Sequence, residues 1–137
     1  MFGFLNTTAS LPKSFTSALE DAYTASEMQQ LDRFGTMLHL KAGTRLATEG
    51  NTGREVFLIV QGEADVLRGG ETIATVGSGA VIGESAVLTN EPRNATLVAS
   101  TDVETVVFSR RDFNSLLAAN PELEQRFTQL ATSRDAN

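Results

Sequence analysis

The chain has 137 residues, a length that suits a single domain with a sizeable core, and we expect no second domain within residues 1–137. Its 11 basic and 17 acidic residues give a net charge of -6, which argues against a surface that binds nucleic acid or an anionic membrane. The absence of cysteine excludes disulfides, thiolate metal sites and cysteine nucleophiles, and it agrees with a cytoplasmic location.

Two helices are expected before residue 36. The chain begins with a short apolar run that has no basic flank, so we expect neither a signal peptide nor a membrane-spanning helix there. Apolar residues then recur at helical spacing, which predicts a helix from Pro12 to Tyr23. Ser26 is expected to cap a second helix that ends near Gly35. The inward side chains of this second helix are Met28, Leu31 and Phe34. We expect both helices, over about residues 12–35, to pack on one end of the β-rich region.

Residues 36–109 change to short runs rich in β-branched and apolar residues, separated by glycine-containing turns. Several of these runs alternate apolar with polar side chains, the pattern of strands with one buried face. The expected strands are Met37–Leu40, Arg45–Thr48, Val56–Gln61, Glu63–Leu67, Thr72–Val76, Ala95–Ala99 and Val103–Phe108. Their spacing indicates an antiparallel sandwich or roll, so the predicted fold class is mainly β with flanking helices (α+β).

Two further helices are expected over about residues 110–132. Ser109 precedes Asp112 by three residues, the Ser-x-x-acid form of a helix start. The inward side chains of this helix are Phe113, Leu116 and Leu117. Asn120 is expected to end it and, as N-cap before Pro121, to begin the next one. The last helix carries an apolar stripe that includes Leu123, Phe127 and Leu130.

Residues 83–96 contain the most specific chemistry of the chain, in the order Gly-Glu-Ser-Ala-Val-Leu-Thr-Asn-Glu-Pro-Arg-Asn-Ala-Thr. Gly83 permits a sharp turn, and the next five residues are long enough for about one helical turn before the turn-forming residues 89–92. Backbone N–H groups at the start of that short helix and the Arg93 guanidinium would face an anion, while Glu84 would accept a hydrogen bond from a hydroxyl. The stretch therefore predicts a site for a small ligand that carries both groups.

The spacing Gly-Glu-x-Ala-x5-Pro-Arg-x-Ala-Thr resembles the phosphate-binding cassette of cyclic nucleotide-binding domains, the regulatory modules of catabolite-activator-like proteins, cyclic-nucleotide-dependent kinases and gated channels. The resemblance implies an antiparallel β-roll, or double-stranded jelly roll, with N-terminal helices and two C-terminal helices that move when ligand binds. It implies that Glu84 binds the ribose 2′-hydroxyl and that Arg93 binds the cyclic phosphate. Small residues would complete the phosphate cradle: Gly83, Ser85, Ala86 and Ala95.

The chain departs from the family pattern at Ile82, Ser85 and Asn94, and none of these changes removes a charged contact. We expect cAMP rather than cGMP as ligand, because members that prefer guanine often carry Thr or Ser at the position of Asn94. The Asn94 side chain would either reach a base edge or hydrogen-bond its own loop. Phe127 or Leu130 would either fold over the base as a lid, as in some family members, or pack in the core or a helical interface.

Two functions from different classes remain open. Glu84 and Arg93 would also suit a structural salt bridge, but such a bridge would not require the small and turn residues at fixed spacing. The lone His39 and the absence of a nucleophile motif argue against a metal site and against an enzyme. The principal hypothesis is a cAMP receptor module that signals to a separate effector protein in trans. The alternative is a ligand-free roll that serves as a protein-interaction or homodimerisation module through an exposed apolar stripe on its last helix.

Overall fold

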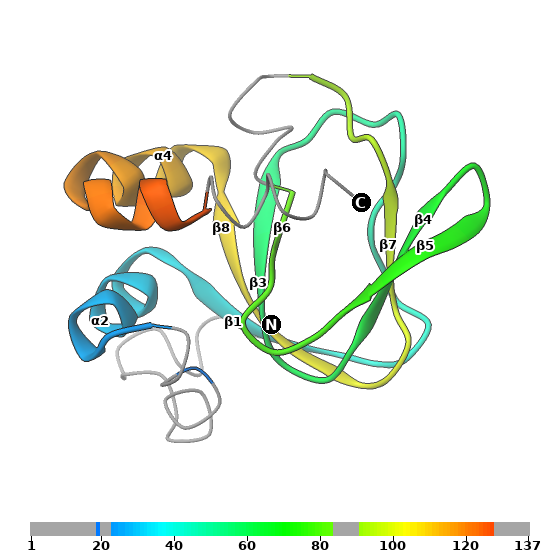
Figure 1. The fold of residues 1–137 in the computed structure, drawn as a ribbon, viewed down its shortest axis with the longest axis horizontal. Coiled ribbons are helices and arrows are strands. Elements are labelled where there is room, and N and C mark those ends of the chain that lie inside the picture. The colour runs from blue at the N-terminus through cyan, green and yellow to red at the C-terminus, as the bar shows by residue number, and fades with distance from the viewer. Residues whose placement is uncertain (1–18, 20–22, 84–90, 128–137) are drawn as a thin grey trace.

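Two antiparallel four-stranded sheets form the body of the molecule, and helices flank them (Figure 1). This computed structural model describes residues 19, 23–83 and 91–127. The first sheet consists, in spatial order, of β1 (Thr36–Leu40), β8 (Val103–Ser109), β3 (Glu55–Gln61) and β6 (Val81–Ile82). The second consists of β2 (Arg45–Ala47), β7 (Thr96–Ala99), β4 (Ala64–Arg68) and β5 (Glu71–Val76). This arrangement confirms the predicted antiparallel β-roll with flanking helices.

The strand β3 contributes side chains to the hydrophobic clusters on both faces of the first sheet, because its sequence is apolar on both faces. Its residues 56–60 are all buried, and it pairs with β8 on one side and β6 on the other. Val56 and Leu58 belong to the cluster shared with the helices, whereas Phe57 and Ile59 face the space between the two sheets. Alternate side chains of a strand point to opposite faces, so one uninterrupted apolar run can stabilise two layers.

The helix α2 (Ala25–Phe34) is capped at its N-terminus by Thr24 and not by the expected residue Ser26. The Thr24 hydroxyl accepts a hydrogen bond from the N–H of Glu27 at 3.1 Å, and the Glu27 carboxylate accepts one from the N–H of Thr24 at 2.8 Å. This reciprocal capping box satisfies two otherwise unpaired donors, which explains why the helix starts earlier than predicted. Gly35 ends the helix as predicted, and an added Cβ there would collide with side chains of β8.

The helix α4 (Arg110–Ala119) begins as the sequence predicts, since the Ser109 hydroxyl accepts a hydrogen bond from the N–H of Asp112 at 3.0 Å. Residues 121–127 form the following helical segment. Asn120 lies between the two, at the C-cap of α4 and at the N-cap position before Pro121, as the sequence predicts. Its Nδ2 donates to the carbonyl of Leu116 at 2.9 Å and so closes α4. The backbone carbonyl of Asn120, and not its side chain, accepts the first bond of the next helix.

The apolar stripe of the last helix is buried where the structure describes it. Leu123 is 0% exposed and Phe127 is 1% exposed. Both residues belong to the cluster that joins the helices to the outer face of the first sheet. The expectation of an exposed stripe is therefore wrong for these two residues, because they cover the sheet and have no free surface to offer a partner. Leu130 lies outside the described residues.

Most strand boundaries differ from the sequence prediction by one residue, but β6 is absent from that prediction because two residues give no recognisable pattern. The expected helix from Pro12 to Tyr23 lies mostly outside the described residues. Of its length only Leu19 and Tyr23 are described, and both are buried in the helical cluster. Among the described helices, none combines the length and the apolar character needed to cross a bilayer.

Candidate functional site

Arg93 is a buried cation that rests on the strand β3. Its side chain is 6% exposed, and its Nη2 donates to the backbone carbonyl of Glu55 at 2.8 Å. The Oε1 atom of Glu55 lies 3.9 Å from the same nitrogen, and the guanidinium carbon lies 5.8 Å from the centroid of the Phe57 ring. A buried charge needs hydrogen-bond acceptors, a counter-charge or an aromatic face, because its removal from water is costly. β3 provides all three.

The backbone around Arg93 is fixed by the connection between β2 and β3. The N–H of Arg93 donates to the carbonyl of Asn51 at 2.8 Å, and the carbonyl of Arg93 accepts from the N–H of Gly50 at 2.8 Å. An isolated antiparallel bridge joins Thr52 to Pro92. Because the main chain is held on both sides, the guanidinium is presented from a well-defined position.

Gly83 lies directly against the Arg93 guanidinium. It follows β6, whose Ile82 pairs with Phe57 of β3, and its φ of +94° favours glycine. A Cβ added at Gly83 would collide with Nη1 of Arg93 and would lie 2.9 Å from the carbonyl oxygen of Glu55. The two ends of the predicted cassette, Gly83 and Arg93, are thus brought together, and only a residue without a side chain permits this approach.

Asn94 and Ala95 lead from the buried cation to the surface. The Asn94 side chain is exposed, and its backbone carbonyl accepts a hydrogen bond from Nε of Arg68 at 3.0 Å. Ala95 is half-buried against the cluster between the sheets. Glu49 ties the same region to the turn after β4, because its carboxylate accepts from the N–H of Gly69 at 3.0 Å. The chain segment that follows Arg93 is therefore connected to the β4–β5 hairpin.

Phe127 lies on the other side of the first sheet from Arg93. Its ring stacks on Phe113 with a centroid separation of 5.7 Å and meets Tyr23 edge-on at 6.2 Å. Arg93 instead lies beside Phe57, which faces the space between the sheets. In the described arrangement Phe127 is a core residue, and its role as a base lid stays a prediction. Glu84, Ser85, Ala86 and Leu130 lie outside the described residues.

Sequence reasoning missed three contributors to this site: Glu55, Phe57 and Arg68. None belongs to the motif at residues 83–96, and each reaches the site through strand pairing or a long-range hydrogen bond. The contact between Glu55 and Arg93 joins residues 38 positions apart. No local spacing signals such a contact, although the sequence does show an aromatic residue two positions after a glutamate at the start of an apolar run.

A family model described as "Cyclic nucleotide-binding domain" matches residues 37–120. The match includes both sheets, the residues around Gly83 and Arg93, and α4. The chain therefore belongs to the family of cyclic nucleotide-binding domains.

Relatives with curated functions include two kinds of kinase. The chain is 36% identical over 80 residues to a cAMP-dependent protein kinase regulatory subunit of Yarrowia lipolytica, an alignment that covers 57% of this chain and 21% of the relative. It is 35% identical over 79 residues to a cGMP-dependent protein kinase of Caenorhabditis briggsae, with 58% and 10% covered. Across its first curated relatives, the chain spans about a quarter of their length at most.

A solved cyclic nucleotide-binding domain from Methylobacillus flagellatus is similar over most of its length. It is 30% identical in sequence and superposes with a TM-score of 0.75, and the comparison covers 90% of this chain and 78% of that one. The similarity extends over the roll and the flanking helices, so the fold described above is that of the family.

Proposed function

We propose that the chain is a cyclic nucleotide receptor module, with cAMP as the preferred ligand, that signals through its C-terminal helices to a separate effector. The observation that carries this proposal is the buried Arg93 guanidinium, held by β3 and approached by Gly83. A cation fixed in advance loses little conformational freedom when it meets a phosphate, which favours tight binding. We assign the module a regulatory role, which membership of the cyclic nucleotide-binding family supports.

The proposed ligand contacts extend from this fixed cation. Arg93 would hold the cyclic phosphate, since its planar fork matches two phosphate oxygens. Glu84 would accept the ribose 2′-hydroxyl, and in the sequence it directly follows Gly83, the residue that lies against Arg93. The main chain of Ser85, Ala86 and Ala95 would complete the phosphate cradle.

The choice between cAMP and cGMP rests on Asn94. Identity to relatives does not decide it, since the cAMP- and cGMP-dependent kinases match almost equally well. Asn94 directly follows Arg93 in the sequence, and its side chain is exposed and so available to a ligand. We assign cAMP because Asn94 replaces the hydroxyl residue that often accompanies guanine preference in the family.

Titration calorimetry of the purified chain with cAMP and with cGMP tests the proposal. The expected result is a saturable heat with both ligands and a tighter dissociation constant for cAMP. No heat and no shift in melting temperature at millimolar concentrations of either ligand would overturn the receptor function. If such a protein were dimeric by light scattering, the ligand-free interaction module would be the better interpretation, with a surface other than Leu123 and Phe127.

A further inference from the structure

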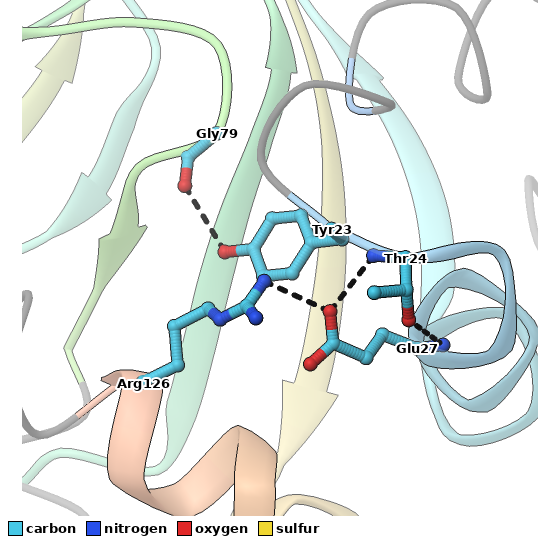
Figure 2. Close-up of polar contacts among 5 residues, drawn as sticks. All are labelled: Tyr23, Thr24, Glu27, Gly79 and Arg126. Carbon is cyan, nitrogen blue, oxygen red and sulfur yellow. Dashed lines mark hydrogen bonds and ion pairs between the residues drawn. The ribbon is translucent and has the colours of Figure 1, made fainter.

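Three side chains connect the N-terminal end of α2 to the segment 121–127, and we refer to these residues, Tyr23, Glu27 and Arg126, as the latch (Figure 2). Nη1 of Arg126, in the segment 121–127, donates to the Glu27 carboxylate of α2 at 2.8 Å. The guanidinium carbon of Arg126 also lies 5.7 Å from the centroid of the Tyr23 ring. The ion pair connects residues 99 positions apart, so it fixes how the two helices pack.

The Glu27 side chain is positioned before Arg126 reaches it. Its carboxylate also accepts the capping-box bond from the N–H of Thr24, and its side chain is 8% exposed, whereas that of Arg126 is 37% exposed. Burial makes an ion pair costly to separate, since one charge would remain in a poorly hydrated place. The latch therefore stabilises the observed position of the segment 121–127.

Tyr23 extends the latch towards the ligand site. Its hydroxyl donates to the carbonyl of Gly79 at 3.1 Å, in the turn that leads into β6 (Figure 2). Burial raises the pKa of this hydroxyl well above its ordinary value, with the Arg126 charge partly offsetting the effect, so the hydroxyl remains a donor at neutral pH. β6 is followed by Gly83, which lies against Arg93. One side of the latch is thus connected to the strand that leads to Gly83.

A hollow lies next to the latch. Its volume is about 490 Å³, and its lining includes Tyr23, Arg126, Val76 and the turn 77–80. A shift of the segment 121–127 towards this hollow would bring it closer to the turn 77–80, which leads into β6. The shift would also separate Arg126 from Glu27 and release Phe127, the neighbour of Arg126, from its stack on Phe113.

We propose that the latch holds the last helix in the position described above and opens when a nucleotide binds, so that it sets nucleotide affinity from outside the site. The inference rests on the proposed receptor function. If only a fraction of molecules has an open latch, the apparent dissociation constant is raised by that fraction. A variant that opens the latch should therefore bind the nucleotide more tightly, although it gains no contact with the ligand.

Glu27→Gln is the sharpest variant because glutamine also serves in a capping box, so only the charge of the pair is lost. The matched control is Glu122→Gln, which removes the same charge from an exposed residue of the segment 121–127. Calorimetry with cAMP on the full chain should show binding tightened about fivefold or more by Glu27→Gln. Glu122→Gln should leave the dissociation constant close to that of the wild type.

Other results of these measurements distinguish failure of the latch from failure of the receptor function. A lowered melting temperature with an unchanged or weaker affinity in Glu27→Gln would show a purely structural ion pair and would overturn the latch. If Glu27→Gln does not fold, Arg126→Gln breaks the same pair from its more exposed side and is expected to tighten binding in the same direction. Absence of cAMP binding by the wild type would instead overturn the receptor function, and the latch with it.

Discussion

At the scale of single residues, the proposed site depends on the contact between Gly83 and Arg93. The glycine adopts a φ of +94° and leaves the space that a side chain would take from the guanidinium. The arginine gains a buried position that it could not keep beside any larger residue. The motif spacing therefore has a steric cause as well as a chemical one.

Gly83→Ala should weaken both the fold and the site. An alanine at this φ is strained by about 1 kcal/mol or more, and its Cβ would in addition push Arg93 from its position on β3. The matched control is Gly43→Ala, since Gly43 has a φ of +91° and no atom within 4 Å of an added Cβ. Urea denaturation should show that both variants are destabilised, and calorimetry with cAMP should show weaker binding in Gly83→Ala alone. Equal affinities in the two variants would contradict the steric argument.

Asn94→Ala tests the base preference. The backbone carbonyl of Asn94, which accepts from Arg68, is kept in the variant, so the loop should be preserved. We expect the preference for cAMP over cGMP to fall about two- to tenfold, the effect of one hydrogen bond of about 0.5–1.5 kcal/mol. Calorimetry with both nucleotides before and after the change measures the ratio. An unchanged ratio would show that Asn94 does not select the base.

At the scale of elements, β3 lies between the proposed site and the helical layer. β3 presents Phe57 to the interior of the roll and Leu58 to the helices, so the proposed ligand site and the helices share one strand. Tyr23 adds a second connection, because it packs in the helical layer and donates to the turn before β6. A displacement on one side of the first sheet can therefore be transmitted to the other side through β3 and through the hydrogen bond of Tyr23.

Tyr23 should make the fold sensitive to alkali. Its pKa is raised in the folded state by burial, whereas the unfolded chain releases the proton near the ordinary pKa of 10.0. The unfolded state thus binds fewer protons above that pH, and the stability present at lower pH is lost as the pH rises. Urea denaturation at about pH 8 to 11 should give a steeper fall in the free energy of unfolding for the wild type than for Tyr23→Phe.

The ultraviolet absorbance of the phenolate provides an independent check, since Tyr23 is the single tyrosine of the chain. In the folded protein its titration should be absent near pH 10 and should appear only with unfolding. Parallel losses of stability in the wild type and Tyr23→Phe, together with an ordinary phenolate titration, would show that the hydroxyl is not held in the folded state as described.

At the scale of the whole molecule, the sequence predicted what local patterns determine. The alternating runs gave the roll, Ser109 and Asp112 marked the start of α4, and the spacing from Gly83 to Thr96 indicated the ligand class. Contacts between residues that are far apart in the sequence could not be predicted from it. The support of Arg93 by Glu55 depends on residues 38 positions apart, and the burial of Phe127 depends on Tyr23 and Phe113. The N-cap of α2 at Thr24 was missed because Thr24 and Ser26 are both residue types that can cap a helix. The ion pair of Glu27 with Arg126 joins residues far apart in the sequence and has no local signal.

The most direct test of the central claim is calorimetry with cAMP on the wild type and on Arg93→Ala, with circular dichroism to verify that the variant is folded. We expect binding by the wild type and a loss of about 2 to 5 kcal/mol of binding free energy in the variant, because a desolvated phosphate loses its main partner. Arg93→Lys, which keeps the charge but not the planar fork, should fall between the two. Absence of binding by the wild type, or an unchanged affinity in a folded Arg93→Ala, would contradict the proposed receptor function.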